Sequence, residues 1–342
     1  MENDMNNEIY EVPESADGIV TENYIPVQKK KSTVLRGVLL FLAADFIYGV
    51  IRMAEYALLS FRGTSADEMY EMYQSGKPVL DIIISILGAV LMFAVGYFYK
   101  KSIKGVLEFF VCMKISGLVS GIVANLLGVV RDLIFEIGSA AYSMAGIVIS
   151  AIGSIAYIAV VVLLFIGIER LEQKTLINRA QTMGYDENGT LITAFRKPLF
   201  TVADVAKVSV ASAVASCIFI PVNLLIFRGI GEFDEMRYSI VSAFLAVASS
   251  AAVLAAMLGV SRLITKNLRS AVYICGCYAF AGHIAGIVCS AVYGVVILIV
   301  GSHTKEAVMA NSFSPVLGQI IAVALSVVLA AKLSKKKDFT EE

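Results

Sequence analysis

Eight long apolar runs alternate with shorter polar segments along the chain of 342 residues. A membrane-spanning helix needs about 20 mostly apolar residues, whereas the strands of a membrane barrel alternate in polarity over about ten residues. The pattern therefore predicts an all-α fold, a polytopic membrane helix bundle of about eight transmembrane helices. The expected spans are roughly residues 35–59, 79–99, 106–130, 144–168, 205–227, 238–260, 272–300 and 313–332.

The lysines and arginines between these spans predict the orientation of the chain. The N-terminal segment, every second connection and the C-terminal segment together hold 19 of them, and the other connections hold six. Short loops rich in Lys and Arg remain in the cytoplasm. We therefore expect a multi-pass protein of the plasma (cell) membrane with both termini in the cytoplasm.

Polar segments divide the chain into two halves, one connection and two tails. The N-terminal segment has seven acidic residues and no Lys or Arg before Lys29, which is typical of a disordered acidic cytoplasmic tail. The expected boundaries are 1–32 for this tail, 33–170 for a first four-helix half, 171–204 for a cytoplasmic connection, 205–334 for a second four-helix half and 335–342 for a cytoplasmic C-terminal tail.

A short motif recurs in the third and seventh spans. Residues 117–123 read GLVSGIV, residues 282–288 read GHIAGIV, and a cysteine precedes each motif by five residues (Cys112 and Cys277). The offset of 165 residues suggests a duplicated four-span unit, with two parallel repeats related by an axis along the membrane normal. Small residues four positions apart also recur in membrane helices simply because they permit close packing, so both explanations stay open.

Composition narrows the class of protein. Apolar residue types make up 58% of the chain and charged types 16%, with a mean hydropathy of +0.78. Soluble domains carry about 25% charged and about 45–50% apolar residues. A water-soluble enzyme, a nucleic-acid-binding protein and a disordered protein are therefore poor interpretations. The lipid bilayer is an expected partner, and nucleic acid is not.

Four polar side chains form a stripe along the first expected span. Asp45, Tyr48, Arg52 and Glu55 are three or four residues apart and therefore share one side of a helix. An unpaired charge near mid-bilayer costs at least about 2.5–3.5 kcal/mol. We expect the stripe to face the interior of the bundle, with Arg52 and Glu55 close enough to pair.

Two further polar residues are predicted at a depth similar to that of Asp45. Lys114 lies in the third span and His283 in the seventh. We expect one polar layer near the bilayer midplane, in which Asp45 pairs with Lys114. This layer has two interpretations: it binds a small polar solute or a proton, or it consists of buried ion pairs that only fix the register of the helices.

The chain lacks the motifs of familiar catalytic and cofactor sites. Its two histidines, His283 and His303, are twenty residues apart, so a histidine metal site is not expected. There is no His-Glu-x-x-His, no G-x-S-x-G and no nucleotide-binding fingerprint in the right context. We expect no catalytic residues, no cofactor and no metal, and an activity other than that of an enzyme.

Two functional hypotheses follow. The first is a permease-like transport protein that binds or moves a small polar solute or proton near the bilayer midplane, through the six polar residues named above. The second is a non-catalytic membrane scaffold or partner subunit that binds another protein through residues 1–28 and the cytoplasmic connection. A polar cavity at Asp45 favours the first hypothesis, and complete packing of Asp45 and Arg52 favours the second.

Overall fold

The computed structural model describes residues 32–60, 66–136, 139–182, 199–222, 235–265, 267–300, 305–335 and 339. The predicted acidic tail before residue 32 and most of the predicted connection lie outside these residues. Every regular element in the described part of the chain is helical. The elements are α1 (Val34–Ser60), α2 (Ala66–Lys100), α3 (Ile103–Ile134), α4 (Ala140–Thr182), α5 (Val202–Cys217), α7 (Glu235–Ala255), η1 (Ala256–Val260), α8 (Ser261–Thr265), α9 (Leu268–Val300) and α10 (Lys305–Leu333).

The membrane class and the fold agree with the sequence. Eight helices among the described residues are long and apolar enough to cross a membrane, and α7, η1 and α8 together provide one of them. The protein is therefore an all-α, multi-pass membrane protein whose helices contact lipid. The expected span in α4 continues as a helix to Thr182, which carries it into the predicted connection.

Two irregularities interrupt the helices. The α-helical pattern of α5 ends at Cys217, four residues before Pro221, because a proline ring clashes with the carbonyl group four positions earlier. The segment η1 is a π-helix, in which the wider turn leaves carbonyl groups without their usual helical partner. The Cys275 thiol of α9 donates a hydrogen bond to the Met257 carbonyl oxygen of this segment (3.3 Å).

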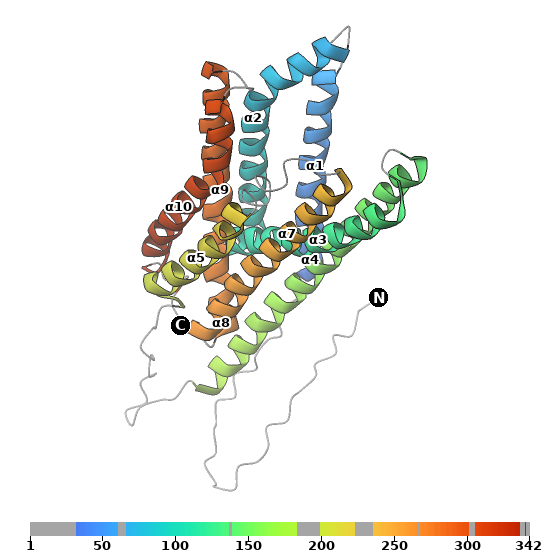
Figure 1. Ribbon diagram of the computed structural model, residues 1–342. Helices are drawn as coiled ribbons and strands as arrows, with labels where there is room; N and C mark the ends of the chain where they lie inside the picture. Colours follow the sequence, from blue (N-terminus) through green and yellow to red (C-terminus); the bar gives the residue numbers. More distant parts are fainter. Residues whose placement is uncertain are drawn as a thin grey trace, which may run out of the picture.

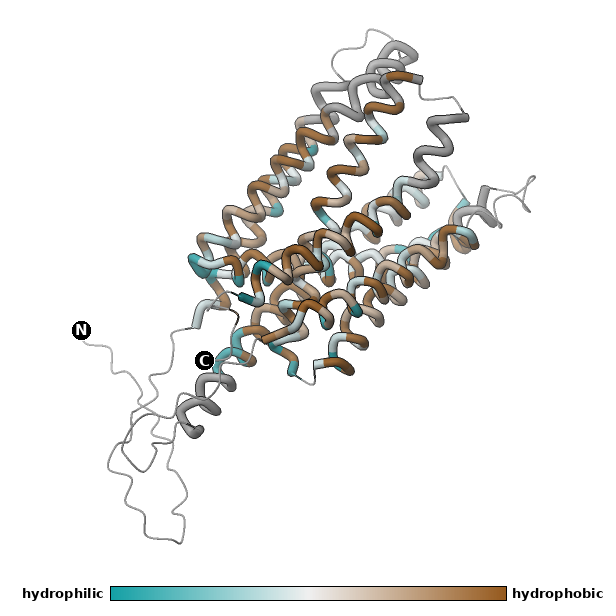
Figure 2. Tube along the Cα trace, turned by 90° about the vertical axis from the view of Figure 1, so that its left-hand side faces the viewer, coloured by the Kyte–Doolittle hydropathy of each residue, from teal (hydrophilic) through white to brown (hydrophobic). Residues whose placement is uncertain are grey.

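The helices converge at one end of the molecule, here called the base, and separate into two arms at the other (Figures 1 and 2). The base contains the end of α2, the end of α8 and the starts of α3 and α9. One arm combines α1 and α2 with the far part of α9 and the first part of α10, and the other combines α3, α4 and α7 (Figure 1). Each arm therefore contains helices from both halves of the chain.

Helix boundaries repeat at the offset that the short motif predicts. The starts of α3 and α9, at Ile103 and Leu268, are 165 residues apart, and so are the starts of α4 and α10. The ends of α2 and α8, at Lys100 and Thr265, show the same offset. The packing follows this pattern, since α3 contacts α4 and α7 while α9 contacts α10 and α2. These regularities support two parallel four-helix repeats.

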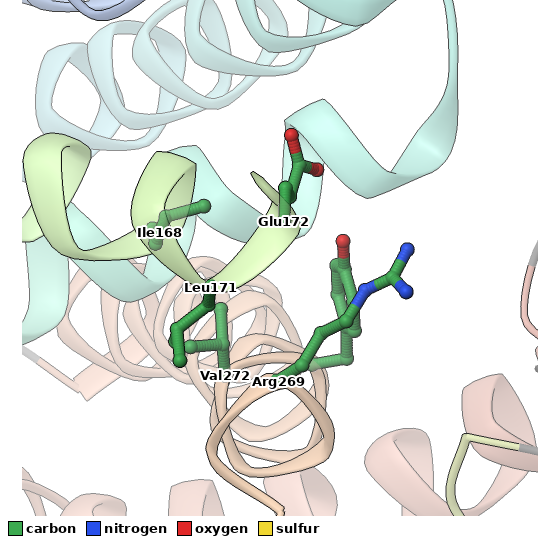
Figure 3. A pocket seen from close by; sticks show the side chains of 6 residues that line it. Ile168, Leu171, Glu172, Arg269 and Val272 are labelled. Atoms are coloured by element: carbon green, nitrogen blue, oxygen red, sulfur yellow. The ribbon is translucent and has the colours of Figure 1, made fainter. Parts of the chain in front are cut away.

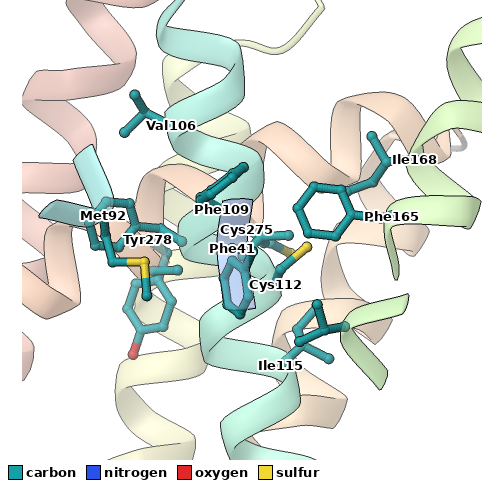
Figure 4. Close-up of a cluster of buried hydrophobic side chains, with 14 of the residues drawn as sticks. Phe41, Met92, Val106, Phe109, Cys112, Ile115, Phe165, Ile168, Cys275 and Tyr278 are labelled. Atoms are coloured by element: carbon teal, nitrogen blue, oxygen red, sulfur yellow. The ribbon is translucent and has the colours of Figure 1, made fainter. Parts of the chain in front are cut away.

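Aromatic side chains hold the first half together near the base. Each of the four helices contributes one buried ring: Phe41 on α1, Tyr99 on α2, Phe109 on α3 and Phe165 on α4. The ring centroids of Phe41, Phe109 and Phe165 lie 5.4–6.1 Å from one another. Figure 4 shows Phe41, Phe109 and Phe165 together with Cys112. Such offset and edge-to-face contacts stabilise a cluster beyond the burial of area alone.

A second buried cluster closes the base beside α9. Phe339 belongs to the predicted C-terminal tail, yet it is buried against Phe200 and Tyr273, with ring centroids 5.7 Å and 5.6 Å away. Its carbonyl oxygen also accepts a hydrogen bond from the Leu199 backbone N–H (2.8 Å). Phe339 is therefore packed beside the start of α5 and the start of α9.

Candidate functional site

Charged side chains from three helices meet in the interior of the base. Lys100 at the end of α2 places its Nζ 2.7 Å from both carboxylate oxygens of Glu108 on α3, and 2.6 Å from Oε1 of Glu172 on α4. The Tyr273 hydroxyl of α9 donates a hydrogen bond to Glu108 Oε1 (3.2 Å). We call Lys100, Glu108, Glu172 and Tyr273 the base cluster.

Local geometry brings Lys100 to Glu108. The chain reverses between α2 and α3 in two residues, and Lys101 adopts a left-handed backbone conformation (φ 51°) at this turn. Two glycines then let the helices cross closely, because a Cβ at Gly105 would collide with the Gly96 carbonyl oxygen. The lysine at the end of α2 consequently lies beside a carboxylate less than two turns into α3.

The base cluster leaves little space. A small pocket beside it is lined by Ile168, Leu171, Glu172, Arg269, Val272 and Tyr273 (Figure 3), and it has room for no more than about one water molecule. Arg269 interacts with the Tyr273 side chain, and its Nε atom is buried without a hydrogen-bond partner. The base is thus closed by paired charges and packed side chains.

Above the base cluster, α3 and α9 cross in direct contact. A Cβ at Gly276 would lie 2.8 Å from the Leu107 Cβ and 2.9 Å from the Leu107 carbonyl oxygen, so only glycine fits at this crossing. The Phe110 ring contacts Phe280 and His283 on α9, with centroid distances of 4.9 Å and 5.4 Å.

Beyond this crossing the two helices separate. Gly117 and Gly121 on α3 and Gly282 and Gly286 on α9 belong to the repeated motif, yet a Cβ at any of them would meet no atom within 4 Å. Small residues in membrane helices normally permit close helix packing. These four glycines do not serve that purpose in this conformation. Gly117 and Gly121 continue the side of α3 that carries Leu107 and Phe110, and we call the space that they border, on the side of the arms, the opening.

Two of the predicted site residues lie where the opening begins. Lys114 is one turn beyond Phe110 on α3, and its side chain is exposed, while the His283 ring contacts Phe110 from α9. The His283 Nε2 atom is buried and has no hydrogen-bond partner. Among the described residues, no carboxylate forms an ion pair with Lys114. Lys114 and His283, which are expected at a similar depth, thus both lie beside Phe110.

The expected pair between Asp45 and Lys114 is wrong. Asp45 is half-buried and interacts with the hydroxyl group of Tyr157 on α4, which in turn interacts with Ser116 on α3. Ser116 and Lys114 are two positions apart, so they lie on opposite sides of α3. Asp45 therefore faces protein, as expected, but on the side of α3 away from α9.

The rest of the stripe on α1 lies against α2. Arg52 Nε donates a hydrogen bond to the Tyr48 hydroxyl (3.2 Å), and its guanidinium lies 5.7 Å from the centre of that ring. The Tyr48 ring fills the place where a Cβ of Gly88 would stand. The Glu55 side chain lies outside the described residues, so its expected pairing with Arg52 stays a prediction.

The second half of the chain has a polar link between α5, α9 and α10, which are the counterparts of α1, α3 and α4 in the repeat. Gln319 on α10 accepts a hydrogen bond from the Tyr278 hydroxyl of α9 (2.7 Å), and its amide nitrogen donates to Ser216 Oγ on α5 (3.2 Å). Asp45, Tyr157 and Ser116 connect α1, α4 and α3 in the same way. Because the members of the second link are uncharged, they do not stand out from the apolar sequence around them.

Sequence reasoning did not find the base cluster. Glu108 is recognisable as a charge inside an apolar run, and the short turn after Lys100 would have suggested its partner. Glu172 and Tyr273 could not be assigned, because they are brought in by the packing of α4 and α9. No group of three metal-binding side chains occurs among the described residues. Comparison with family models, curated proteins and solved structures found no match to this chain.

Proposed function

We propose that this protein is a permease-like membrane protein that binds a small polar solute in the opening between α3 and α9 and moves it across the bilayer. The observation that carries the proposal is the separation of α3 and α9 directly beyond their tight crossing at Gly276. A lysine and an unsatisfied histidine nitrogen lie at that point. Intramembrane ionisable residues in such positions mark solute pathways.

The two ends of the proposed pathway differ. The base is rich in basic residues, namely Lys100, Lys101, Lys104, Arg269 and Lys332. This concentration of positive charge favours a base on the cytoplasmic side and an opening that faces outward. In this orientation the base cluster closes the pathway toward the cytoplasm. Transport then requires that the base cluster separates while the arms approach each other, and the four unpacked glycines leave α3 and α9 free to do so.

The scaffold hypothesis is the second candidate, and one observation favours it. Asp45 and Tyr48 are engaged with neighbouring helices, as a structural role requires. In this alternative, the N-terminal segment of residues 1–28 and the cytoplasmic connection bind a protein partner. The two candidates differ in one result, because a scaffold inserts into the membrane but carries no solute.

Flux measurements in proteoliposomes test the proposal. The purified protein is reconstituted, and uptake is followed for a panel of small neutral, anionic and cationic solutes. We expect uptake of at least one solute above empty liposomes. The Lys114→Gln variant is expected to slow it by about tenfold or more, since a hydrogen bond to a charged group contributes about 1.5–3 kcal/mol.

Two further variants complete this test. Asp45→Asn is expected to have a smaller effect, because the amide oxygen can still accept a hydrogen bond from Tyr157. Lys207→Gln, which removes another exposed lysine in a predicted span, is expected to have none. No uptake for any solute class, with the protein correctly inserted, would support the scaffold instead.

A further inference from the structure

We infer that Lys114 and His283 bind the anionic group of a solute, a carboxylate or a phosphate, at the bottom of the opening. This inference rests on the proposed function, because it assigns a chemical class to the solute of that same site. It is carried by an exposed lysine on α3 and, beside it on α9, a buried histidine nitrogen without a hydrogen-bond partner, whose ring contacts Phe110 one turn before the lysine.

The position of Lys114 indicates that it faces the opening. Lys114 follows Phe110 by four residues and so lies on the same side of α3, where the Phe110 ring contacts Phe280 and His283 of α9. Lipid-exposed lysines in the middle of a membrane are rare, because their charge is costly there. An exposed lysine on this side of α3 is stable when water or an anion from the opening surrounds it.

His283 contributes a second polar atom. Its ring rests against Phe110 (5.4 Å between centroids), which fixes the ring at the level of the crossing. Its Nε2 atom has no hydrogen-bond partner, although buried polar atoms in proteins nearly always have one. A ligand oxygen that accepts a hydrogen bond from Nε2 would satisfy this atom.

The nearby carboxylates are occupied elsewhere. Asp45 lies on the opposite side of α3 and interacts with Tyr157. Glu108 lies nearly two turns closer to the base and is held by Lys100. Among the described residues, the bottom of the opening therefore carries positive charge without a compensating acidic side chain. An anionic ligand group provides that compensation, whereas a cation would be repelled.

The site has space for a ligand. Gly117 follows Lys114 by three residues, and Gly282 precedes His283 directly. A Cβ at either glycine would meet nothing within 4 Å. A carboxylate or phosphate group can thus reach Lys114 from the opening without displacing protein atoms, and it reaches the buried Nε2 atom of His283 once that ring turns toward the opening. Soluble anions and anionic lipid headgroups share this chemistry.

Thermal unfolding of the purified full-length protein in a non-ionic detergent tests the inference and separates the two sources. One arm adds sodium acetate, succinate or phosphate, with sodium chloride at equal ionic strength as the reference. The other arm adds dioctanoyl phosphatidylglycerol, with dioctanoyl phosphatidylcholine as the reference. We expect at least one anion to raise the Tm by about 2–4 °C over its reference.

The variants assign this shift to the site. The shift should disappear in Lys114→Gln, decrease in His283→Gln, and remain in Lys114→Arg and Lys207→Gln. The arginine variant keeps the charge, so it remains informative if the glutamine variant does not fold. Absence of a shift with every anion, or an equal shift in folded Lys114→Gln, would overturn the inference.

The outcome is distinguishable from a failure of the proposed function. Solute uptake without any anion-dependent shift would retain the permease and reject the anionic class. An anion-dependent shift that requires Lys114, in a protein that carries no solute, would retain the site and reject transport.

Discussion

Replacing Lys100 with Met is expected to lower the free energy of unfolding by about 3–5 kcal/mol. Glu108 is completely buried, and the Lys100 and Glu172 side chains are only 14% and 18% exposed. Removing the lysine leaves two adjacent carboxylates without their shared cation in the interior of the base. Unfolding in mixed micelles with increasing SDS measures the loss.

Two control variants separate this effect from a general loss of positive charge. Lys101→Met removes the neighbouring lysine, which is exposed at the turn, and is expected to change stability by no more than about 0.5 kcal/mol. The double variant Lys100→Met with Glu108→Leu is expected to recover part of the loss, because it removes the fully buried charge as well. Equal stability of Lys100→Met and Lys101→Met would show that the base cluster does not stabilise the fold.

Replacing Gly276 with Ala is expected to destabilise the protein by roughly 1–3 kcal/mol, the usual cost of adding atoms to a filled interior. The added Cβ would lie 2.8 Å from the Leu107 Cβ and 2.9 Å from the Leu107 carbonyl oxygen. Because one of these atoms belongs to the backbone, a change of side-chain rotamer cannot relieve the contact. Thermal unfolding in detergent measures the effect as a decrease in Tm.

Gly282→Ala is the matched control on the same helix. A Cβ at Gly282 would meet nothing within 4 Å, and Ala is favoured over Gly in a helix by about 1 kcal/mol. This variant is therefore expected to be as stable as the wild type or slightly more stable. A Gly276→Ala variant with unchanged Tm would mean that α3 and α9 do not cross as closely as described.

The spans were predictable because the signal for a membrane helix is local. A run of apolar residues of sufficient length specifies a helix regardless of its neighbours, and all eight expected spans correspond to helices. Hydropathy alone does not mark the ends of the helices: α4 continues to Thr182, beyond its apolar run, and it is the helical periodicity of residues 169–183 that indicates this extension. A helix can extend into water, where hydropathy no longer marks it. The π segment at Ala256–Val260 has no counterpart in the hydropathy pattern either.

The candidate site was only partly predictable, because sequence gives the depth of a residue but not its neighbours. The similar depth expected for Lys114 and His283 is consistent with their positions, since both lie beside Phe110. The predicted pairing of Asp45 with Lys114 is wrong, because two residues at the same depth can lie on opposite sides of α3. The partner of Asp45 is an uncharged residue of α4, Tyr157, which the charge pattern could not indicate.

In a permease of this kind, water must reach the opening between α3 and α9. The most direct test is the reaction of a membrane-impermeant thiol reagent with a Cys at Gly117, in membrane vesicles of both orientations. The native cysteines are buried or half-buried, so the wild type gives the background. The matched control is Ile155→Cys, at an exposed apolar position of α4. A thiol reacts as the thiolate, which forms in water and not in hydrocarbon.

We expect the Gly117→Cys variant to react at least tenfold faster than the Ile155→Cys variant, a difference of about 1.4 kcal/mol in activation free energy. The faster reaction should occur with the reagent on the side opposite the base. Equal, slow reaction of both variants from either side would show that Gly117 faces lipid or packed protein, and would contradict the account.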